Sequence, residues 1–192
     1  MTPTPGFTRS SQSRIPLGFP ERQTGTIAAL FSPRMWTPHG LATQTGETVF
    51  WDRSTLYGFR GVLRAGETDL ALRYLEAFTR RRLLGDHVPY PIEVGPKGGQ
   101  QHLFSESALY CRVLNEGLFG ILPSGLDRFR CTPQLPDAWP RMAMRSILAF
   151  GRTWDIVVER REARLGIIVE QHGKRVLDRT IEKGSATDIV LP

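Results

Sequence analysis

The sequence is poor in cysteine and has no long apolar run. Cys111 and Cys131 are its only cysteines, too few for a disulfide framework and without the spacing of a metal-ligand pair. No apolar stretch approaches the roughly 20 residues that cross a bilayer. The start of the chain also lacks a basic segment followed by an apolar stretch and a cleavage site, so no secretory signal is indicated. We therefore expect a cytoplasmic protein with no membrane partner.

The signatures of several enzyme classes are missing as well. There is no Gly-x-Ser-x-Gly elbow, no P-loop and no dinucleotide-binding glycine pattern. The four histidines are scattered rather than closely paired as zinc ligands are, so we expect neither a metal site nor a cofactor. They are His39, His87, His102 and His172.

Charge and composition describe an ordinary globular chain with a mild excess of basic residues. Its 192 residues are 40% hydrophobic and 23% charged, and 25 Lys and Arg against 19 Asp and Glu give a formal charge of +6. This balance permits an anionic partner without requiring one. Basic and acidic residues alternate in ERRE at residues 159–162, which does not make a phosphate-tracking stripe, so we expect no nucleic-acid partner.

The pattern along the chain divides it into three parts. Residues 1–23 have too few large apolar groups to compensate for the entropy of ordering, and we interpret them as a disordered tail. Residues 24–122 carry apolar residues at helical spacing, with helices predicted near 54–65, 68–84 and 105–118. Residues 123–192 are rich in branched residues, which favour strands of an antiparallel sheet, with a hairpin turn at 172–174.

Helix ends and faces give further expectations. Asp52 or Ser54 is a candidate N-cap for the first of these helices, and Thr68 for the second. The arginines at residues 80–82 are expected at a solvated helix C-terminus, where the helix dipole favours cations, rather than at a phosphate site. Cys111 is expected on a buried face as a small core residue.

Three strings resemble one enzyme family. They are NEGLFGI at 115–121, TPQLPDAW at 132–139 and TWDIVV at 153–158. Together they are similar to the stretch that closes the catalytic domain of six-hairpin glycosidases, of the inverting α-glucosidase-like and α-rhamnosidase-like branches. The resemblance spans residues 24–158. It implies an α+β chain, in which the last helical hairpins of an (α/α)6 barrel form a partial α/α toroid that leads into a C-terminal antiparallel β-sheet or sandwich.

The predicted helices are too few for six hairpins. The resemblance therefore implies the C-terminal part of a glycoside hydrolase, a truncated copy, or one subunit of a split enzyme. The missing N-terminal barrel half, or another subunit, would then be a partner.

Inverting hydrolysis of an O-glycosidic bond needs a general acid and a general base on opposite faces of the sugar. The resemblance implies that Glu93 is the base, and that the acid lies in the missing upstream barrel, so this chain alone should be inactive. Glu106 is the rival carboxylate, but its place near a predicted helix start favours a role in the N-terminal turn.

A carbohydrate substrate would be held by aromatic and polar side chains. Sugar C–H faces pack on indole rings, and histidine, arginine and aspartate side chains bind hydroxyls. The candidates are Trp36, His39, Trp51, Asp52, Arg53 and His102. For Trp36 and Trp51 the competing interpretation is that they close the edge of a core. The alternative function is a non-catalytic carbohydrate-binding module or a vestigial scaffold.

Overall fold

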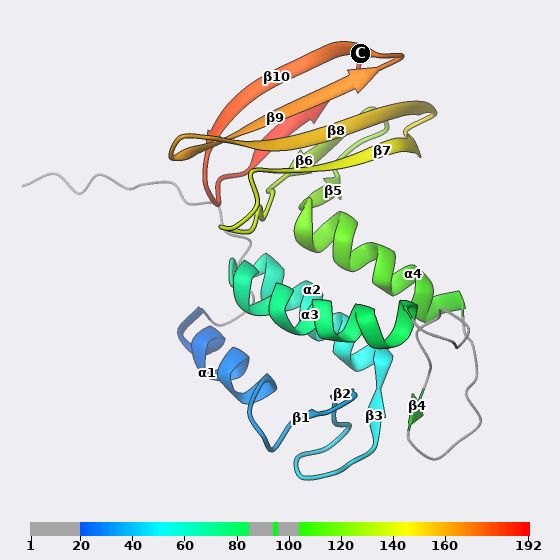
Figure 1. Cartoon of the computed structure of the whole chain (residues 1–192). Helices are drawn as coiled ribbons and strands as arrows, with labels where there is room; N and C mark the ends of the chain where they lie inside the picture. The colour runs from blue at the N-terminus through cyan, green and yellow to red at the C-terminus, as the bar shows by residue number, and fades with distance from the viewer. Residues whose placement is uncertain (1–19, 85–93, 96–103) are drawn as a thin grey trace, which may run out of the picture.

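The computed structural model describes residues 20–84, 94–95 and 104–192. The chain is α+β, with helices packed together at one side and antiparallel strands at the other (Figure 1). We call residues 20–118 the helical half and residues 121–192 the sheet half. The expected change from helical to extended structure after Phe119 is confirmed.

The helical half is built around one central amphipathic helix. The elements are α1 (Pro20–Leu30), α2 (Asp52–Arg64), α3 (Thr68–Leu83), α4 (Phe104–Arg112) and the π-helix η1 (Val113–Leu118). α2 contacts α3, α4 and η1, and buries Leu56, Phe59 and Leu63 because these lie on one face at helical spacing. It ends at Arg64, and the chain turns at Gly66, whose φ of +90° suits a residue without a Cβ.

The buried face of α4 differs from the expected one. Leu109 of α4 and Val113, the first residue of η1, are buried, whereas Cys111 is exposed, so the prediction of a buried Cys111 is wrong. Leucine and valine remove more apolar area from water than cysteine, and these two side chains therefore take the packed face.

Four two-residue strands lie at one end of the helices. They are β1 (Trp36–Thr37), β2 (Gly40–Leu41), β3 (Phe50–Trp51) and β4 (Val94–Gly95). β1 and β2 form a hairpin, and β3 pairs antiparallel with β4. β3 leads directly into α2, so the residues around Trp51 are fixed at the start of the central helix (Figure 1).

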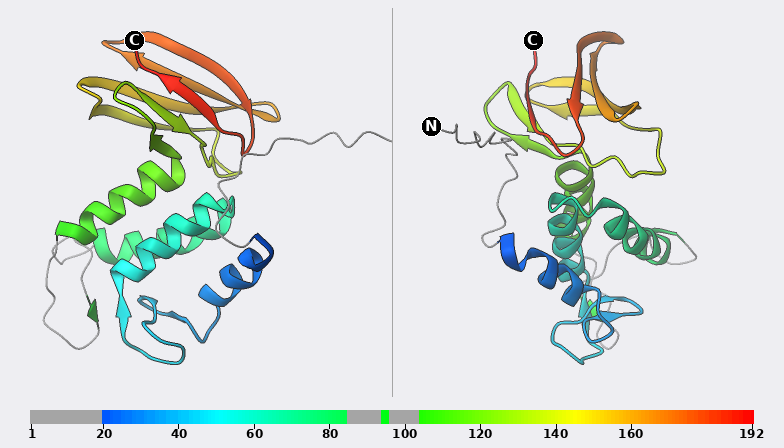
Figure 2. Two further views of the ribbon diagram at one scale, coloured as in Figure 1. Left: turned by 180° about the vertical axis from the view of Figure 1, so that it is seen from behind. Right: turned by 90° about the vertical axis from the view of Figure 1, so that its left-hand side faces the viewer.

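Two antiparallel sheets make up the sheet half. The first has the order β11-β6-β5 and the second the order β10-β9-β8-β7, and Figure 2 shows them facing each other. The strands are β5 (Ile121–Pro123), β6 (Arg128–Cys131), β7 (Arg141–Ala149), β8 (Arg152–Arg161), β9 (Arg164–Gln171), β10 (Lys174–Glu182) and β11 (Thr187–Val190). Phe129 of β6 stacks on Trp154 of β8 with ring centroids 4.9 Å apart, so the two sheets share a core.

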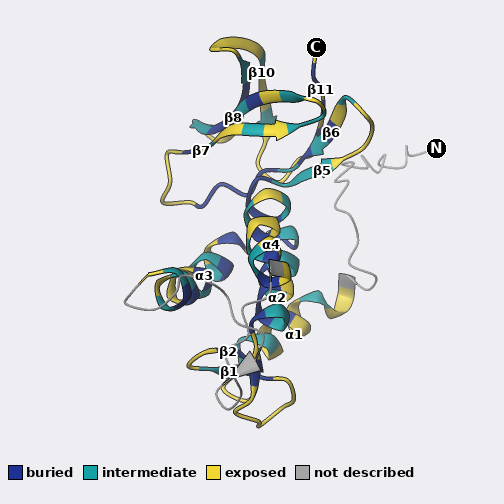
Figure 3. Cartoon of the chain, turned by 90° about the vertical axis from the view of Figure 1, so that its right-hand side faces the viewer, coloured by how far each residue is buried: buried dark blue, intermediate teal, exposed yellow. Residues whose placement is uncertain are grey.

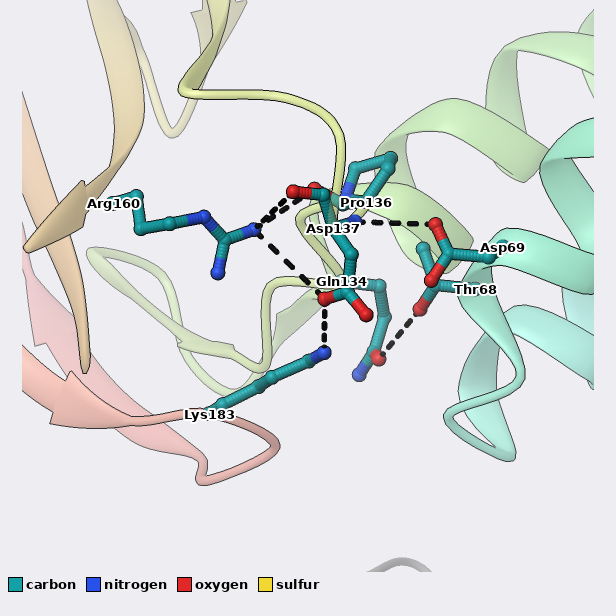
Figure 4. A network of polar contacts seen from close by, with 7 residues as sticks. All are labelled: Thr68, Asp69, Gln134, Pro136, Asp137, Arg160 and Lys183. Carbon is teal, nitrogen blue, oxygen red and sulfur yellow. Dashed lines mark hydrogen bonds and ion pairs between the residues drawn. The ribbon is translucent and has the colours of Figure 1, made fainter. Parts of the chain in front are cut away.

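A polar network on the connector between β6 and β7 joins the two halves (Figure 4). Thr68, at the start of α3, donates a hydrogen bond to Gln134 Oε1 (3.2 Å). The Asp137 amide donates to Asp69 Oδ1 (3.1 Å), while Arg160 of β8 donates to the Pro136 carbonyl (2.9 Å). Residues 133–136 are buried between the halves (Figure 3). The connector thus fixes the sheet against α3.

The starts of three helices differ from what the sequence predicts. No side-chain hydrogen bond caps α2 or α3, whose N-cap residues are Trp51 and Glu67, so the predicted caps from Asp52, Ser54 and Thr68 are wrong. Asp52 and Thr68 lie inside their helices and bind other side chains instead. α1 begins at Pro20, within the stretch interpreted as a tail, and residues 1–19 lie outside the described ones.

No helix in the described part of the chain has the length and the apolar character that crossing a membrane requires.

Candidate functional site

Most of the candidate residues gather where the ends of three helices meet. Asp52 and Arg53 open α2, Arg81 and Arg82 lie in the last turn of α3, and Glu106 lies in the first turn of α4. The strands β1, β2 and β3 lie at the same end of the helices (Figure 1). Two helix N-termini and one C-terminus therefore converge on a single charged cluster.

A buried ion pair between Asp52 and Arg82 ties α2 to α3. Arg82 Nε lies 2.9 Å from Asp52 Oδ2, and Nη2 donates to Oδ1 at 3.2 Å. The Asp52 carboxylate is fully buried, and the Arg82 guanidinium lies over the Phe50 ring at 5.1 Å. The expectation of a solvated end is therefore wrong for Arg82, while Arg80 is exposed and pairs with Glu76. Asp52 serves this pair and has no surface that a sugar could touch.

A second buried carboxylate, Glu106, ties α4 to α2. Arg53 Nε donates to Glu106 Oε1 at 2.8 Å, and the Ser105 hydroxyl donates to Oε2 at 2.7 Å. Glu106 is fully buried, whereas the Arg53 side chain is 39% exposed. Glu106 does lie in the first helical turn as expected, but its carboxylate binds a neighbouring helix. Arg53 is consequently held in place while part of it reaches solvent.

His39 and Arg81 add positive charge beside these pairs. The His39 ring is exposed on the turn between β1 and β2 and stacks on Phe50, with centroids 5.0 Å apart and planes at 20°. Desolvation lowers the pKa of His39, and the charges of Arg81 and Arg82 lower it further. Burial and the charge of Arg82 also lower the pKa of Arg81.

The two candidate tryptophans have different surroundings. Trp36 is half-buried and packs against Phe31, Phe59 and Tyr74, with the nearest ring centroid 4.6 Å away. It closes the edge of the core, which was the competing interpretation. Trp51 is 41% exposed and lies immediately before Asp52 and Arg53, so it is the tryptophan of the two that can stack on a ligand at the cluster.

Glu93 and His102 lie outside the described residues. Val94, which follows Glu93 in the sequence, pairs with Trp51 across β3 and β4. Within the described residues, no group of three or more His, Cys, Asp and Glu side chains could hold a metal ion.

Two cavities lie elsewhere on the molecule. One, of about 70 Å³, lies between the end of α2, η1 and β5, and includes Gly66 and Gly117. The other, of about 330 Å³, is an apolar groove between α1 and α2. Neither of these two cavities is lined by residues of the charged cluster.

The arrangement defines what the cluster can do chemically. Asp52 and Glu106 are fully buried and paired with arginines, so they position other groups instead of exchanging protons with a substrate. The exposed surfaces of Trp51, Arg53 and His39 are available for stacking and hydrogen bonding. Comparisons with family models, with curated proteins and with solved structures find no match to this chain.

Proposed function

We propose that this chain is the C-terminal portion of an inverting glycoside hydrolase, and that it supplies a saccharide-binding wall around Trp51. In this proposal α1 to α4 belong to the last hairpins of an (α/α)6 toroid, and the two facing sheets are its C-terminal β-sandwich. The observation that supports the proposal most directly is the exposed Trp51 held beside two buried arginine–carboxylate pairs.

Rigid support is what a sugar platform requires. Binding a flexible side chain costs about 0.5 to 1.5 kcal/mol in lost rotamer freedom, so a pre-ordered ring and guanidinium bind more tightly. Trp51 is anchored through its backbone, because its carbonyl accepts a hydrogen bond from Thr55 (3.1 Å) and it pairs with Val94. Arg53 is anchored by Glu106. A pyranose stacked on Trp51 would thus place its hydroxyls near Arg53.

Catalysis in this proposal is shared with a partner. Glu93 would activate the water, and the general acid would come from the upstream barrel half or from another subunit. A lone base cannot also protonate the leaving oxygen, so the 192-residue chain should bind saccharide without hydrolysing it.

Paired tryptophan variants test the binding part of the proposal. Trp51→Ala should raise the Kd for α-linked glucose or rhamnose oligosaccharides about tenfold or more, since stacking and apolar burial on the indole are lost. Trp139→Ala is the matched control, because Trp139 is exposed on the connector away from the cluster. Isothermal titration calorimetry measures both. If no saccharide binds, or if Trp139→Ala is the damaging variant, the proposal is wrong.

Turnover tests the catalytic part. In the assembled protein, Glu93→Gln should reduce kcat by roughly 10²- to 10⁴-fold with little change in sugar affinity, as expected for a general base. The product should appear with inverted anomeric configuration in a proton NMR time course. Saccharide binding with no turnover in the assembled protein would instead support the non-catalytic carbohydrate-binding module.

A further inference from the structure

The charges of the cluster do not cancel. Arg82 is matched by Asp52, and Arg53 is matched by Glu106. The charge of Asp52 also acts on Arg81, but within the described part of the chain Arg81 has no hydrogen-bond or ion-pair partner of its own, although it is half-buried beside Arg82. A partly desolvated guanidinium without a counter-charge is energetically costly, and an anion beside it removes that cost.

Aromatic contacts place His39 near the same positive charge. Its ring stacks on Phe50, whose own ring lies under the Arg82 guanidinium. Arg81 precedes Arg82 in the last turn of α3, and its positive charge lowers the pKa of His39. Phe50 is followed directly by the exposed Trp51. An aromatic platform, a hydrogen-bonding imidazole and an unmatched guanidinium therefore lie at one end of the helices.

From this juxtaposition we infer that the saccharide bound at Trp51 is an acidic sugar, whose carboxylate binds Arg81 and His39. The inference rests on the proposed function, since it names the substrate class of the same site. One unmatched guanidinium suits one carboxylate, because the two planar groups form paired, charge-assisted hydrogen bonds. A neutral sugar would leave Arg81 and Arg82 to share the single negative charge of Asp52.

The inference predicts a particular pH dependence. The groups that face His39 are Phe50 of β3 together with Arg81 and Arg82 of α3, the latter already paired with Asp52. A bound carboxylate favours protonated His39 and so raises its pKa towards or above the ordinary histidine value of about 6.5. Binding then takes up a proton, and affinity should increase as the pH falls from 7.5 to 5.5. A sugar carboxylate stays ionised there, because its pKa lies near 4.

Matched arginine variants on α3 provide the test. The probes are glucuronic acid and its oligosaccharides, glucose and its oligosaccharides, glucose 6-phosphate, and inorganic phosphate, with Kd measured by calorimetry. Wild type should bind glucuronate at least tenfold more tightly than glucose, and Arg81→Gln should abolish that difference. Arg80→Gln is the control, because Arg80 is exposed and pairs with Glu76, and it should change no Kd by more than about twofold. His39→Gln should remove the pH dependence.

The outcomes separate the inference from the proposed function. Equal binding of glucuronate and glucose, or a glucuronate preference that survives Arg81→Gln, overturns the acidic-sugar inference and leaves saccharide binding intact. Tighter binding of glucose 6-phosphate or inorganic phosphate than of glucuronate also overturns it, in favour of a phosphate site. Binding of no saccharide at all contradicts both. Loss of the preference in Arg81→Gln but not in Arg80→Gln supports the inference.

Discussion

In the helical half two carboxylates, Asp52 and Glu106, are fully buried against arginines, whereas the ion pairs described in the sheet half lie on exposed strand faces. Arg145, for example, pairs with Asp155 and Glu170 while remaining 52% exposed. A charge taken out of water must keep its partner, because losing it leaves an unsolvated ion. A surface pair can be lost at little cost, because water and salt replace it.

The difference separates two roles. The sheet half is stabilised by apolar packing between its sheets, with Trp154 and Phe129 at the centre, and its charges mainly keep the surface polar. The helical half places its costly charges where three helix ends meet. Buried ion pairs contribute little net stability compared with apolar groups of the same volume. In the proposed function, the pairs beside Trp51 hold a saccharide-binding surface in place.

The largest contrast between the halves should be in thiol reactivity. Burial raises the pKa of Cys131 to about 12, and its thiol is fully enclosed, whereas Cys111 is exposed on α4. At pH 8 the thiolate fraction of Cys131 should be lower than that of an ordinary cysteine by roughly three orders of magnitude. Titration with a disulfide reagent should therefore show one fast thiol in the native protein and two after unfolding in urea.

Cys111→Ser is the control for this contrast, since it should remove the fast phase completely. Two fast thiols in the native protein would mean that the sheet core around Cys131 opens readily, contrary to the packing described above.

Next in size is the effect of breaking the Asp52–Arg82 pair. Arg82→Met leaves a fully buried carboxylate without its counter-charge and should lower the free energy of unfolding by about 3 to 5 kcal/mol. Arg80→Met, on the exposed face of the same helix, should cost roughly 0.5 kcal/mol or less. Urea denaturation monitored by circular dichroism measures both.

A double variant distinguishes the loss of the ion pair from a general failure to fold. Asp52→Asn combined with Arg82→Met removes both charges and should recover part of the lost stability, because no unpaired buried ion remains at this position. Equal effects of Arg82→Met and Arg80→Met would show that the pair is not buried as described.

The smallest effect is expected from the surface pair of the sheet half. Hydrogen bonds from the Ser146 amide and from Arg145 hold the pKa of Asp155 below its usual range. A depressed carboxyl pKa stabilises the fold above the unfolded value, near 3.9, and this contribution is lost as the pH falls through the lower, folded value. Arg145→Gln should therefore shift the urea midpoint only slightly at pH 6, and the shift should shrink as the pH falls through the folded pKa of Asp155. A large shift at pH 6 would contradict the assignment of Arg145 to a weak surface pair.

Much of the fold could be predicted from local patterns in the sequence. The spacing of Leu56, Phe59 and Leu63 predicts α2, the glycine at 66 predicts its end, and branched residues predict the long strands β7 to β10. The strands β5 and β6 are too short to give a recognisable period. The pairing of β6 with β11, far along the chain, cannot be predicted from the local periodicity of either strand.

The candidate site was harder to predict because it depends on which helix ends meet. The sequence singles out Trp51, Asp52 and Arg53 as a group, but the burial of Asp52 follows from Arg82, thirty residues away on an antiparallel helix. The one available signal was charge: an acidic residue at one helix start and a basic run at the next helix end complement each other when the two helices pack side by side. Charge considered for each helix separately does not reveal the pair, because the pairing depends on how the two helices pack.

The central claim is that saccharide binds at Trp51 in the helical half and not on the sheet half. The chain has four tryptophans, so the indole N–H region of a nitrogen–proton correlation spectrum offers one probe at each position, assigned by single substitution. Titration with a glucuronate oligosaccharide should shift the Trp51 indole signal most, and should leave the Trp139 and Trp154 signals in place. Shifts of Trp139 or Trp154 with an unmoved Trp51 signal would place the ligand on the sheet half and contradict the account.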